Sequence, residues 1–260
     1  MIQCVLGMKR YILGPVLFLL IAAAFFVGKE RVLGVSTGAP PYGEPEGEVP
    51  TGPLAWLRDW SRPDVPPTAG IQVGHYKNEE FPEELAKLRG NSGAAAAGVA
   101  EWEVNLAIAE QMKVILEKEG VVVDIIPATV PPGYWADAFV AVHADGSLDG
   151  SKSGYKFAGP WRDLTGDSDR LVELLSQEYE KATDLKFDPN ITRNMRGYYA
   201  FSFWRYRHAV HPMTTAVIAE TGFLTNASDR RLLTSSPEIP ARAMTNAILQ
   251  YLEEEGLLPS

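Results

Sequence analysis

The chain has 260 residues, 46% of them hydrophobic, so it can bury the core of one domain and carry additional segments. Its formal net charge of -9 argues against a nucleic-acid partner, because phosphate binding requires a basic surface. The only cysteine is Cys4, which excludes a disulfide framework and a cysteine-based zinc cluster within the chain, so a metal would need carboxylates and the 4 histidines.

An uncharged apolar run extends from Tyr11 to Gly28 near the start of the chain, with charged residues on both sides. Its length exceeds that of a signal-peptide core and lies near the lower end of the about 17 to 25 residues that a membrane helix needs. We expect residues 1–35 to form an uncleaved signal-anchor, because no small-residue cleavage site follows the run. A cleaved signal peptide, which would give a secreted protein, is the alternative. Both interpretations place the rest of the chain outside the cytoplasm, and an anchor would keep it at the cell membrane.

Residues 36–68 are rich in Pro, Gly and Glu and poor in aliphatic residues, which predicts an extended linker stiffened by proline. The apolar patch from Leu54 to Trp60 lies within this linker. We expect it to form a short helix that packs on the domain, with contact to a membrane surface or the cell wall as the alternative. The folded domain is expected to span residues 69–260.

Short apolar segments alternate with amphipathic segments in the remainder of the chain. We expect strands at 70–74, 121–126, 138–142, 154–157 and 216–219. We expect helices at 101–119, 168–183, 228–233 and 240–254. Residues 184–212 are irregular and rich in Arg and aromatic residues, the composition of a binding loop or cleft wall. The alternation predicts a single α/β domain with a mostly parallel twisted sheet flanked by helices.

Four side chains that can bind a metal or transfer a proton stand at the ends of these elements. His75 follows the first strand, and Glu101 begins the helix after it. His143 and Glu220 end two later strands. If the strands are parallel, all four residues meet at the edge of the sheet where such folds bind ligands. Two imidazoles and a carboxylate are the ligands of a catalytic zinc, and the second carboxylate would be free to act as a general base.

Each of these residues also has a purely structural explanation. A carboxylate in the first turn, such as Glu101, is favoured by the helix dipole alone. Glu220 could meet solvent or cap the helix that starts near Asn226. A single histidine at a strand end is more often structural than a metal ligand. Their coincidence at one sheet edge is what favours a metal site.

The residues around these positions form four motifs in a fixed order. The motifs are Gly74-His75, Glu101-x-x-x-Asn105, Val142-His143-Ala144-Asp145 and Ala219-Glu220-Thr221-Gly222-Phe223-Leu224-Thr225-Asn226. Between about Ile71 and Leu252 the chain thereby resembles the zinc-dependent N-acetylmuramoyl-L-alanine amidases. The resemblance implies a zinc ion held by His75, Glu101 and His143, with Glu220 as the catalytic residue. Glu103 competes with Glu101 as the ligand, but the spacing to Asn105 favours Glu101.

The resemblance also implies a substrate and a reaction. The substrate would be peptidoglycan, and the bond cleaved would be the amide between N-acetylmuramic acid and L-alanine. Weaker substrate contacts are expected from Asn105, Asp145, Arg193, Arg196 and Arg205. His208 and His211 have no counterpart, and we expect structural or cleft-lining roles for them, with a role as a replacement metal ligand as the alternative. The residues around His75 and His143 depart from the usual family motifs. The alternatives are therefore a metallopeptidase or amidase that acts on another peptide, or a non-catalytic peptidoglycan-binding domain.

Overall fold

The computed structural model describes residues 52–259, so the predicted signal-anchor and the first part of the linker lie outside the described residues. No helix in the described part of the chain has the length and apolar character that a membrane span requires. The apolar patch that begins at Leu54 is helical, as expected, and forms the 3-10 helix η1 (Gly52–Asp59). The rings of Trp56 and Trp60 lie 5.3 and 5.5 Å from the ring of His211, so this segment packs on the domain.

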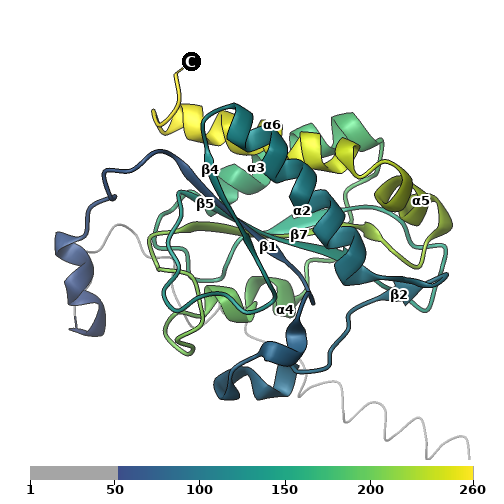
Figure 1. The fold of residues 1–260 in the computed structure, drawn as a ribbon, viewed down its shortest axis with the longest axis horizontal. Coiled ribbons are helices and arrows are strands. Elements are labelled where there is room, and N and C mark those ends of the chain that lie inside the picture. Colours follow the sequence, from purple (N-terminus) through teal and green to yellow (C-terminus); the bar gives the residue numbers. More distant parts are fainter. Residues whose placement is uncertain (1–51, 260) are drawn as a thin grey trace, which may run out of the picture. The chain divides into compact units, whose positions relative to one another are not determined.

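A five-stranded sheet forms the centre of the domain, with the strand order β4-β1-β5-β7-β6 (Figure 1). Its strands are β1 (Thr68–Val73), β4 (Val122–Ile126), β5 (Ala138–Asp145), β6 (Lys156–Ala158) and β7 (Thr215–Phe223). Every neighbouring pair is parallel except β6 with β7, which is antiparallel, so the prediction of a mostly parallel sheet is confirmed. A small hairpin pairs β2 (Ala95–Ala96) with β3 (Val99–Ala100).

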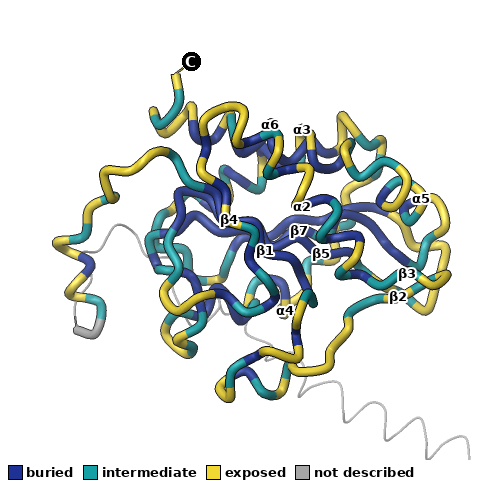
Figure 2. The backbone as a smooth tube through the Cα atoms, viewed as in Figure 1, coloured by how far each residue is buried: buried dark blue, intermediate teal, exposed yellow. Residues whose placement is uncertain are grey.

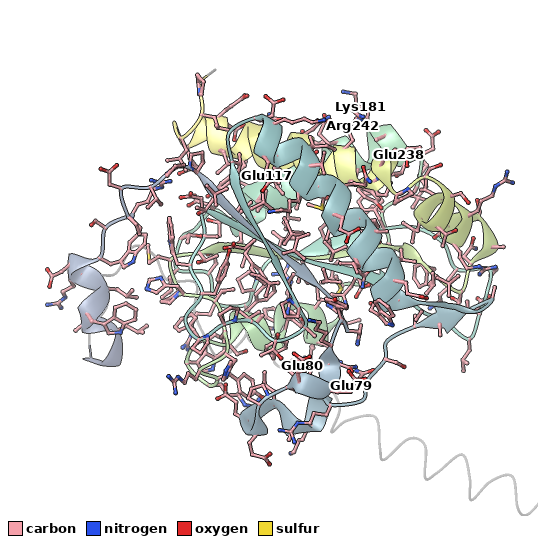
Figure 3. The ribbon with its side chains drawn as sticks, viewed as in Figure 1. Glu79, Glu80, Glu117, Lys181, Glu238 and Arg242 are labelled. Carbon is pink, nitrogen blue, oxygen red and sulfur yellow. The ribbon has the colours of Figure 1, made fainter. Side chains whose placement is uncertain are left out.

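The α-helices are α2 (Glu101–Lys118), α3 (Ser168–Thr183), α4 (Arg193–Arg196), α5 (Ala227–Ser235) and α6 (Glu238–Glu254). Short 3-10 helices are η2 (Asn78–Glu80), η3 (Glu83–Leu88) and η4 (Tyr199–Phe201). In α2 the residues at helical spacing, Val104, Ile108, Met112 and Leu116, are buried, and the helix ends before Gly120, whose φ of +83° suits glycine. The six charged side chains labelled in Figure 3 are all exposed to solvent.

The two faces of the sheet are covered differently. The long helices α2, α3 and α6 pack over one face, where Val140 and Val142 of β5 join the larger hydrophobic cluster (Figures 1 and 2). Phe139 and Ala141 belong to a second cluster on the other face, which is covered by η3, α4, η4 and irregular chain. The prediction that helices flank the sheet is therefore confirmed for one face. The aromatic segment 184–212 covers much of the other face, where its residues Tyr199 and Phe201 belong to the core.

Two strands continue well beyond their predicted carboxyl ends. β5 continues through His143 to Asp145, and β7 continues through Glu220 to Phe223, so neither His143 nor Glu220 ends its strand. The polar residues do not stop the ladder because they pair with each other in register. The hydroxyl of Thr221 also donates to the carbonyl of His143 at 2.8 Å, which satisfies a buried acceptor beyond the predicted strand end.

Candidate metal centre

His75 lies just beyond the carboxyl end of β1. Its φ of 63° is in the left-handed region, which a residue with a side chain occupies only where the surroundings enforce it. The Nδ1 atom lies 2.5 Å from the carbonyl oxygen of Asn91, so Nδ1–H donates to that oxygen. The Nε2 atom is then free and lies 3.5 Å from Oε1 of Glu101. Burial lowers the pKa of His75, which favours the neutral ring that a metal ligand requires.

Glu101, the first residue of α2, turns its carboxylate into the domain and is only 3% exposed. Oε2 accepts a hydrogen bond of 2.7 Å from the backbone N–H of Ala94, and Oε1 accepts one of 3.1 Å from that of Ala144. Burial opposes ionisation, but the hydrogen bond and charge of His143 hold the pKa of Glu101 below its ordinary value. Glu101 is therefore an ionised, acceptor-only group.

The structure separates the roles of Glu101 and Glu103. Glu103 accepts a hydrogen bond of 2.8 Å from the backbone N–H of Ala100 and so caps the start of α2. Asn105 lies one turn further along the helix, and its Nδ2 donates to Oε1 of Glu101 at 3.4 Å and to the carbonyl of Gly74 at 3.3 Å. Asn105 is completely buried, so it is placed to hold Glu101 rather than to touch a substrate.

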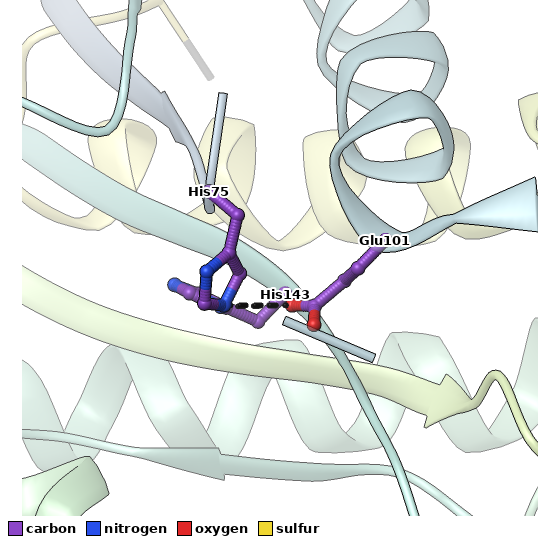
Figure 4. A group of neighbouring side chains, drawn as sticks. All are labelled: His75, Glu101 and His143. Carbon is purple, nitrogen blue, oxygen red and sulfur yellow. Dashed lines mark hydrogen bonds and ion pairs between the residues drawn. The ribbon is translucent and has the colours of Figure 1, made fainter. Parts of the chain in front are cut away.

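His143 completes a compact group with His75 and Glu101 (Figure 4). Its Nδ1 atom lies 3.0 Å from Oε1 of Glu101, and its ring meets that of His75 edge to face at 5.1 Å. One ligand atom from each of the three residues lies within 4.8 Å of the other two. Gly74 makes room for this arrangement, because a Cβ atom there would lie 2.5 Å from Cε1 of His143.

The sheet register places Glu220 directly beside His143. His143 of β5 pairs with Glu220 of β7, and Glu220 pairs with Lys156 of β6, so the three side chains lie in one row across the sheet. Oε2 of Glu220 is buried and has no hydrogen-bond partner among the described residues. Burial raises the pKa of Glu220 to about 8, with the charges of Glu101 and Asp145 adding to the rise and those of His143 and Lys156 opposing it. A carboxyl group with such a pKa suits proton transfer near neutral pH.

Lys156 supplies a positive charge at the end of this row. Its Nζ atom lies 2.6 Å from Oδ2 of Asp145 and 3.1 Å from Oδ2 of Asp188. The lysine side chain is only 5% exposed, so these two carboxylates compensate the burial of its charge. Asp145 is thereby fixed beside Glu220 by a charged partner.

A cavity of about 360 Å³ opens onto this group. Among the residues expected in the site from the sequence, His75, Glu101, His143, Asp145 and Glu220 line it. The predicted arginines lie elsewhere. The guanidinium groups of Arg196 and Arg205 stack on Trp161 and Tyr206 at 5.1 and 5.0 Å, and exposed Arg193 begins α4.

The two remaining histidines lie outside the cluster that the described residues form. Nδ1 of His208 lies 2.6 Å from Oε1 of Glu84, so this histidine joins η3 to the segment before β7. His211 packs against η1. Both contacts are structural, in line with the roles expected for these residues.

Sequence reasoning missed several residues that shape the site. Asn91 and Gly93 lie in a Gly/Ala-rich loop before α2, to which no element or role was assigned from the sequence. Tyr198, whose hydroxyl lies 3.3 Å from Nε2 of His143, comes from an irregular segment without hydrophobic periodicity. Lys156 was assigned only to a short strand. The high content of glycine and aromatic residues was a signal for the first three, but it did not indicate which residues face the site.

No protein-family model matches the sequence, and no curated protein matches it. Among solved structures, Ami1 from Mycobacterium smegmatis, an N-acetylmuramyl-L-alanine amidase, superposes with a TM-score of 0.52 at 16% identity, over 72% of this chain and 97% of that one. The CwlD amidase from Clostridioides difficile, in complex with the GerS lipoprotein, gives 0.51 at 19% identity, over 72% and 99% of the two chains.

A third similar structure is the N-acetylmuramoyl-L-alanine amidase AmiC2 of Nostoc punctiforme, with a TM-score of 0.50, 20% identity and coverage of 72% of this chain and 97% of that one. The chain has the amidase fold. Since the aligned part takes in nearly all of each similar chain, the amidase fold accounts for the complete α/β domain. The buried His75–Glu101–His143 cluster within this amidase fold is compatible with a metal site.

Proposed function

We propose that this protein is a zinc-dependent N-acetylmuramoyl-L-alanine amidase that acts on peptidoglycan. One observation carries the proposal: the His75–Glu101–His143 cluster and the unpartnered carboxylate of Glu220 line the same cavity. A metal site with a neighbouring free carboxylate is the arrangement that metal-assisted amide hydrolysis requires. The amidase fold supports the choice of reaction.

The donor set fits zinc better than the other common metals. His75, Glu101 and His143 offer two nitrogen atoms and one oxygen atom, whereas magnesium and calcium prefer six or more oxygen ligands. Oε1 of Glu101 lies 3.5 and 3.0 Å from Nε2 of His75 and Nδ1 of His143, close to the separation of neighbouring ligands about 2.1 Å from a shared zinc. When bound, zinc polarises the amide carbonyl and lowers the pKa of water to about 7.

Glu220 is proposed as the general base and acid. It accepts a proton from the attacking water while a bond forms between the water oxygen and the amide carbon. It then delivers that proton to the nitrogen of L-alanine as the carbon–nitrogen bond breaks, so the leaving group departs as a neutral amine. Its position beside His143 in the sheet register and its place in the cavity wall support this role.

The remaining predicted residues are proposed to contact the polymer at greater distance. Asp145 lines the cavity and is proposed to meet the substrate beside the scissile amide. Arg193 and Arg196 lie on α4, and these two residues and Arg205 are proposed to bind carboxylates of neighbouring stem peptides. Charge-reversal variants of these arginines should weaken sedimentation of the protein with intact cell walls, and unchanged sedimentation would remove them from the proposed substrate contacts.

We also propose that the chain acts outside the cytoplasm and is anchored by residues 1–35, with residues 36–68 as a linker to the domain. The apolar run Tyr11–Gly28 and the Pro-rich composition that follows support this arrangement. Recovery of the full-length protein in the membrane fraction, with its domain accessible to external protease, is expected. Recovery of a shortened protein in the medium would favour the secreted alternative.

The proposal is tested with the full-length protein and the Glu220→Gln variant. About one zinc per chain is expected in both, because Glu220 is not a proposed ligand. Mass spectrometry of digested cell walls should show stem peptides with a free L-alanine amine only after treatment with the unmutated protein. Zinc without wall cleavage would favour a metallopeptidase acting on another peptide, whereas absence of zinc would favour a non-catalytic wall-binding domain.

A further inference from the structure

His143 has a polar contact on the side of its ring opposite Glu101. While Nδ1 lies 3.0 Å from Oε1 of Glu101, Nε2 lies 3.3 Å from the hydroxyl oxygen of Tyr198. The two rings meet edge to face, with centroids 5.5 Å apart and planes at 85°. We propose that Tyr198 is a positioning residue whose hydroxyl fixes the tautomer and orientation of His143 for metal binding. The inference rests on the metal site of the proposed function.

The two histidines of the cluster have opposite orientations. His75 uses Nδ1–H to donate to the carbonyl of Asn91 and leaves Nε2 free toward Glu101. His143 presents Nδ1 to Glu101, so its single proton in the neutral state must sit on Nε2 if Nδ1 is to bind a metal. A buried N–H requires an acceptor, and the oxygen of Tyr198 lies where that acceptor is needed. Asn91 and Tyr198 therefore perform equivalent tasks for the two histidines.

The surroundings of the Tyr198 hydroxyl are largely apolar. His143 is only 7% exposed, and Tyr198 lines an additional pocket of about 70 Å³ with both histidines and the apolar side chains of Phe81 and Leu88. The loss of the hydroxyl would remove the side-chain acceptor of Nε2–H. The alternative tautomer, with its proton on Nδ1, would donate to Glu101 and would no longer offer a lone pair to a metal.

The aromatic segment on the second face of the sheet holds the hydroxyl in place. The ring of Tyr198 packs against those of Tyr199 and Phe201 at 4.9 and 5.6 Å. The backbone N–H of Tyr198 donates to the carbonyl of Met195 at 3.2 Å, and the hydroxyl of Ser202 donates to the carbonyl of Tyr198 at 3.3 Å. These contacts order the turn between α4 and η4, and this turn carries the hydroxyl to the metal centre.

The neighbouring tyrosine provides a matched control. The hydroxyl of Tyr199 accepts hydrogen bonds from Nε2 of Gln72 at 2.8 Å and from the backbone N–H of Val130 at 3.3 Å, and it contacts the carbonyl of Ala128. It has no contact with His143 among the described hydrogen bonds. Tyr199→Phe therefore removes a buried hydroxyl from the same segment without removing the partner of Nε2.

The experiment compares the full-length protein with its Tyr198→Phe and Tyr199→Phe variants. Zinc affinity is measured on metal-free protein by competition with a chromophoric chelator, and the His143 tautomer is read from long-range ¹H–¹⁵N spectra of the imidazole. Tyr198→Phe should weaken zinc binding by about 10- to 100-fold, the usual effect of removing an outer partner of a ligating histidine. As zinc is added, the proton of His143 should move to Nε2 in the unmutated protein, and the Tyr198→Phe variant should need a higher zinc concentration to reach that tautomer. Tyr199→Phe should lower thermal stability while zinc affinity and tautomer stay unchanged.

Two results would overturn the inference. One is a Tyr198→Phe variant with undiminished zinc affinity that reaches the Nε2 tautomer at the same zinc concentration as the unmutated protein. The other is an equal loss of affinity in both variants, which would show a general effect of the aromatic segment. Neither measurement uses an amide substrate, so failure of the protein to cleave peptidoglycan would refute the proposed reaction without affecting this comparison.

Discussion

Replacement of Gly93 by alanine tests the metal centre at a position that is not itself a ligand. Gly93 has a φ of +71°, and a Cβ atom there would lie 2.2 Å from Oε2 of Glu101 and 2.6 Å from Cδ2 of His75. The carboxylate of Glu101 would have to move, and its hydrogen bond of 2.7 Å from the backbone N–H of Ala94 would be lost. The substitution thus displaces a proposed ligand through its surroundings.

Gly90 provides the control for backbone strain. Its φ of +72° nearly equals that of Gly93, but a Cβ atom there would meet no atom within 4 Å. Both alanine variants should lose about 1–2 kcal/mol of stability because an L-residue is disfavoured in the left-handed region. Only Gly93→Ala should also lose zinc affinity. Removal of a residue that only hydrogen-bonds to a metal ligand weakens metal binding by up to about 100-fold. Displacement of the ligand Glu101 itself should weaken zinc binding by at least this factor, which corresponds to about 2.8 kcal/mol.

The assay is chelator competition on the two metal-free variants at a temperature where both are folded, with thermal unfolding measured in parallel. Gly90→Ala should bind zinc as tightly as the unmutated protein. Equal zinc affinity of the two variants would refute the claim that Glu101 needs its present position to hold the metal.

Three further predictions concern stability. Lys156→Met leaves the carboxylates of Asp145 and Asp188 without their cation. It should lower the free energy of unfolding in urea by about 3 kcal/mol, near the lower end of the cost of breaking a buried ion pair. A cost below about 1 kcal/mol would show that the ion pair is solvated. Although burial opposes it, hydrogen bonds from Asn190 and Lys156 hold the pKa of Asp188 below its ordinary value of 3.8. The folded state therefore binds fewer protons at this group than the unfolded state, so its stabilisation is present at neutral pH and is lost as the pH falls below 3.8. Between neutral pH and pH values below 3.8, urea unfolding should show a smaller loss of stability for Asp188→Asn than for the unmutated protein. An identical loss would contradict the lowered pKa of Asp188. Ile108→Ala, at a completely buried position of α2, should cost about 2–5 kcal/mol in the same assay, and a cost below about 1 kcal/mol would show that α2 is not packed as described.

Much of the fold is predictable from hydrophobic periodicity. The helix expected at 168–183 has these bounds in the structure, because its apolar stripe is regular and both ends carry polar residues. The ends of β5 and β7 were placed too early, since a charged residue normally marks the end of a buried strand. His143 and Glu220 depart from that rule because each lies beside the other in the sheet.

The candidate site was predictable where it depends on parallel strands and chain order. Those two features suffice to bring His75, Glu101, His143 and Glu220 to one edge of the sheet. They do not reveal Tyr198, whose placement depends on the packing of an irregular aromatic segment. They also do not reveal Lys156, because the antiparallel direction of β6 sets its neighbour, and a three-residue strand carries no directional signal in the sequence.

The strand order also determines when the site can form during folding. β7 lies between β5 and β6 in the sheet but follows both in the chain, so β6 has no neighbour in the sheet until β7 is inserted. The metal cluster comes from residues 75 to 143, whereas the insertion of β7 brings Glu220 beside His143 and Lys156 beside Glu220 at the same time. A nascent or truncated chain that ends before β7 contains all three proposed ligands but lacks the proposed base. Hydrolytic capacity would therefore be acquired only when the last strand enters the sheet, which would keep an incompletely folded chain inactive.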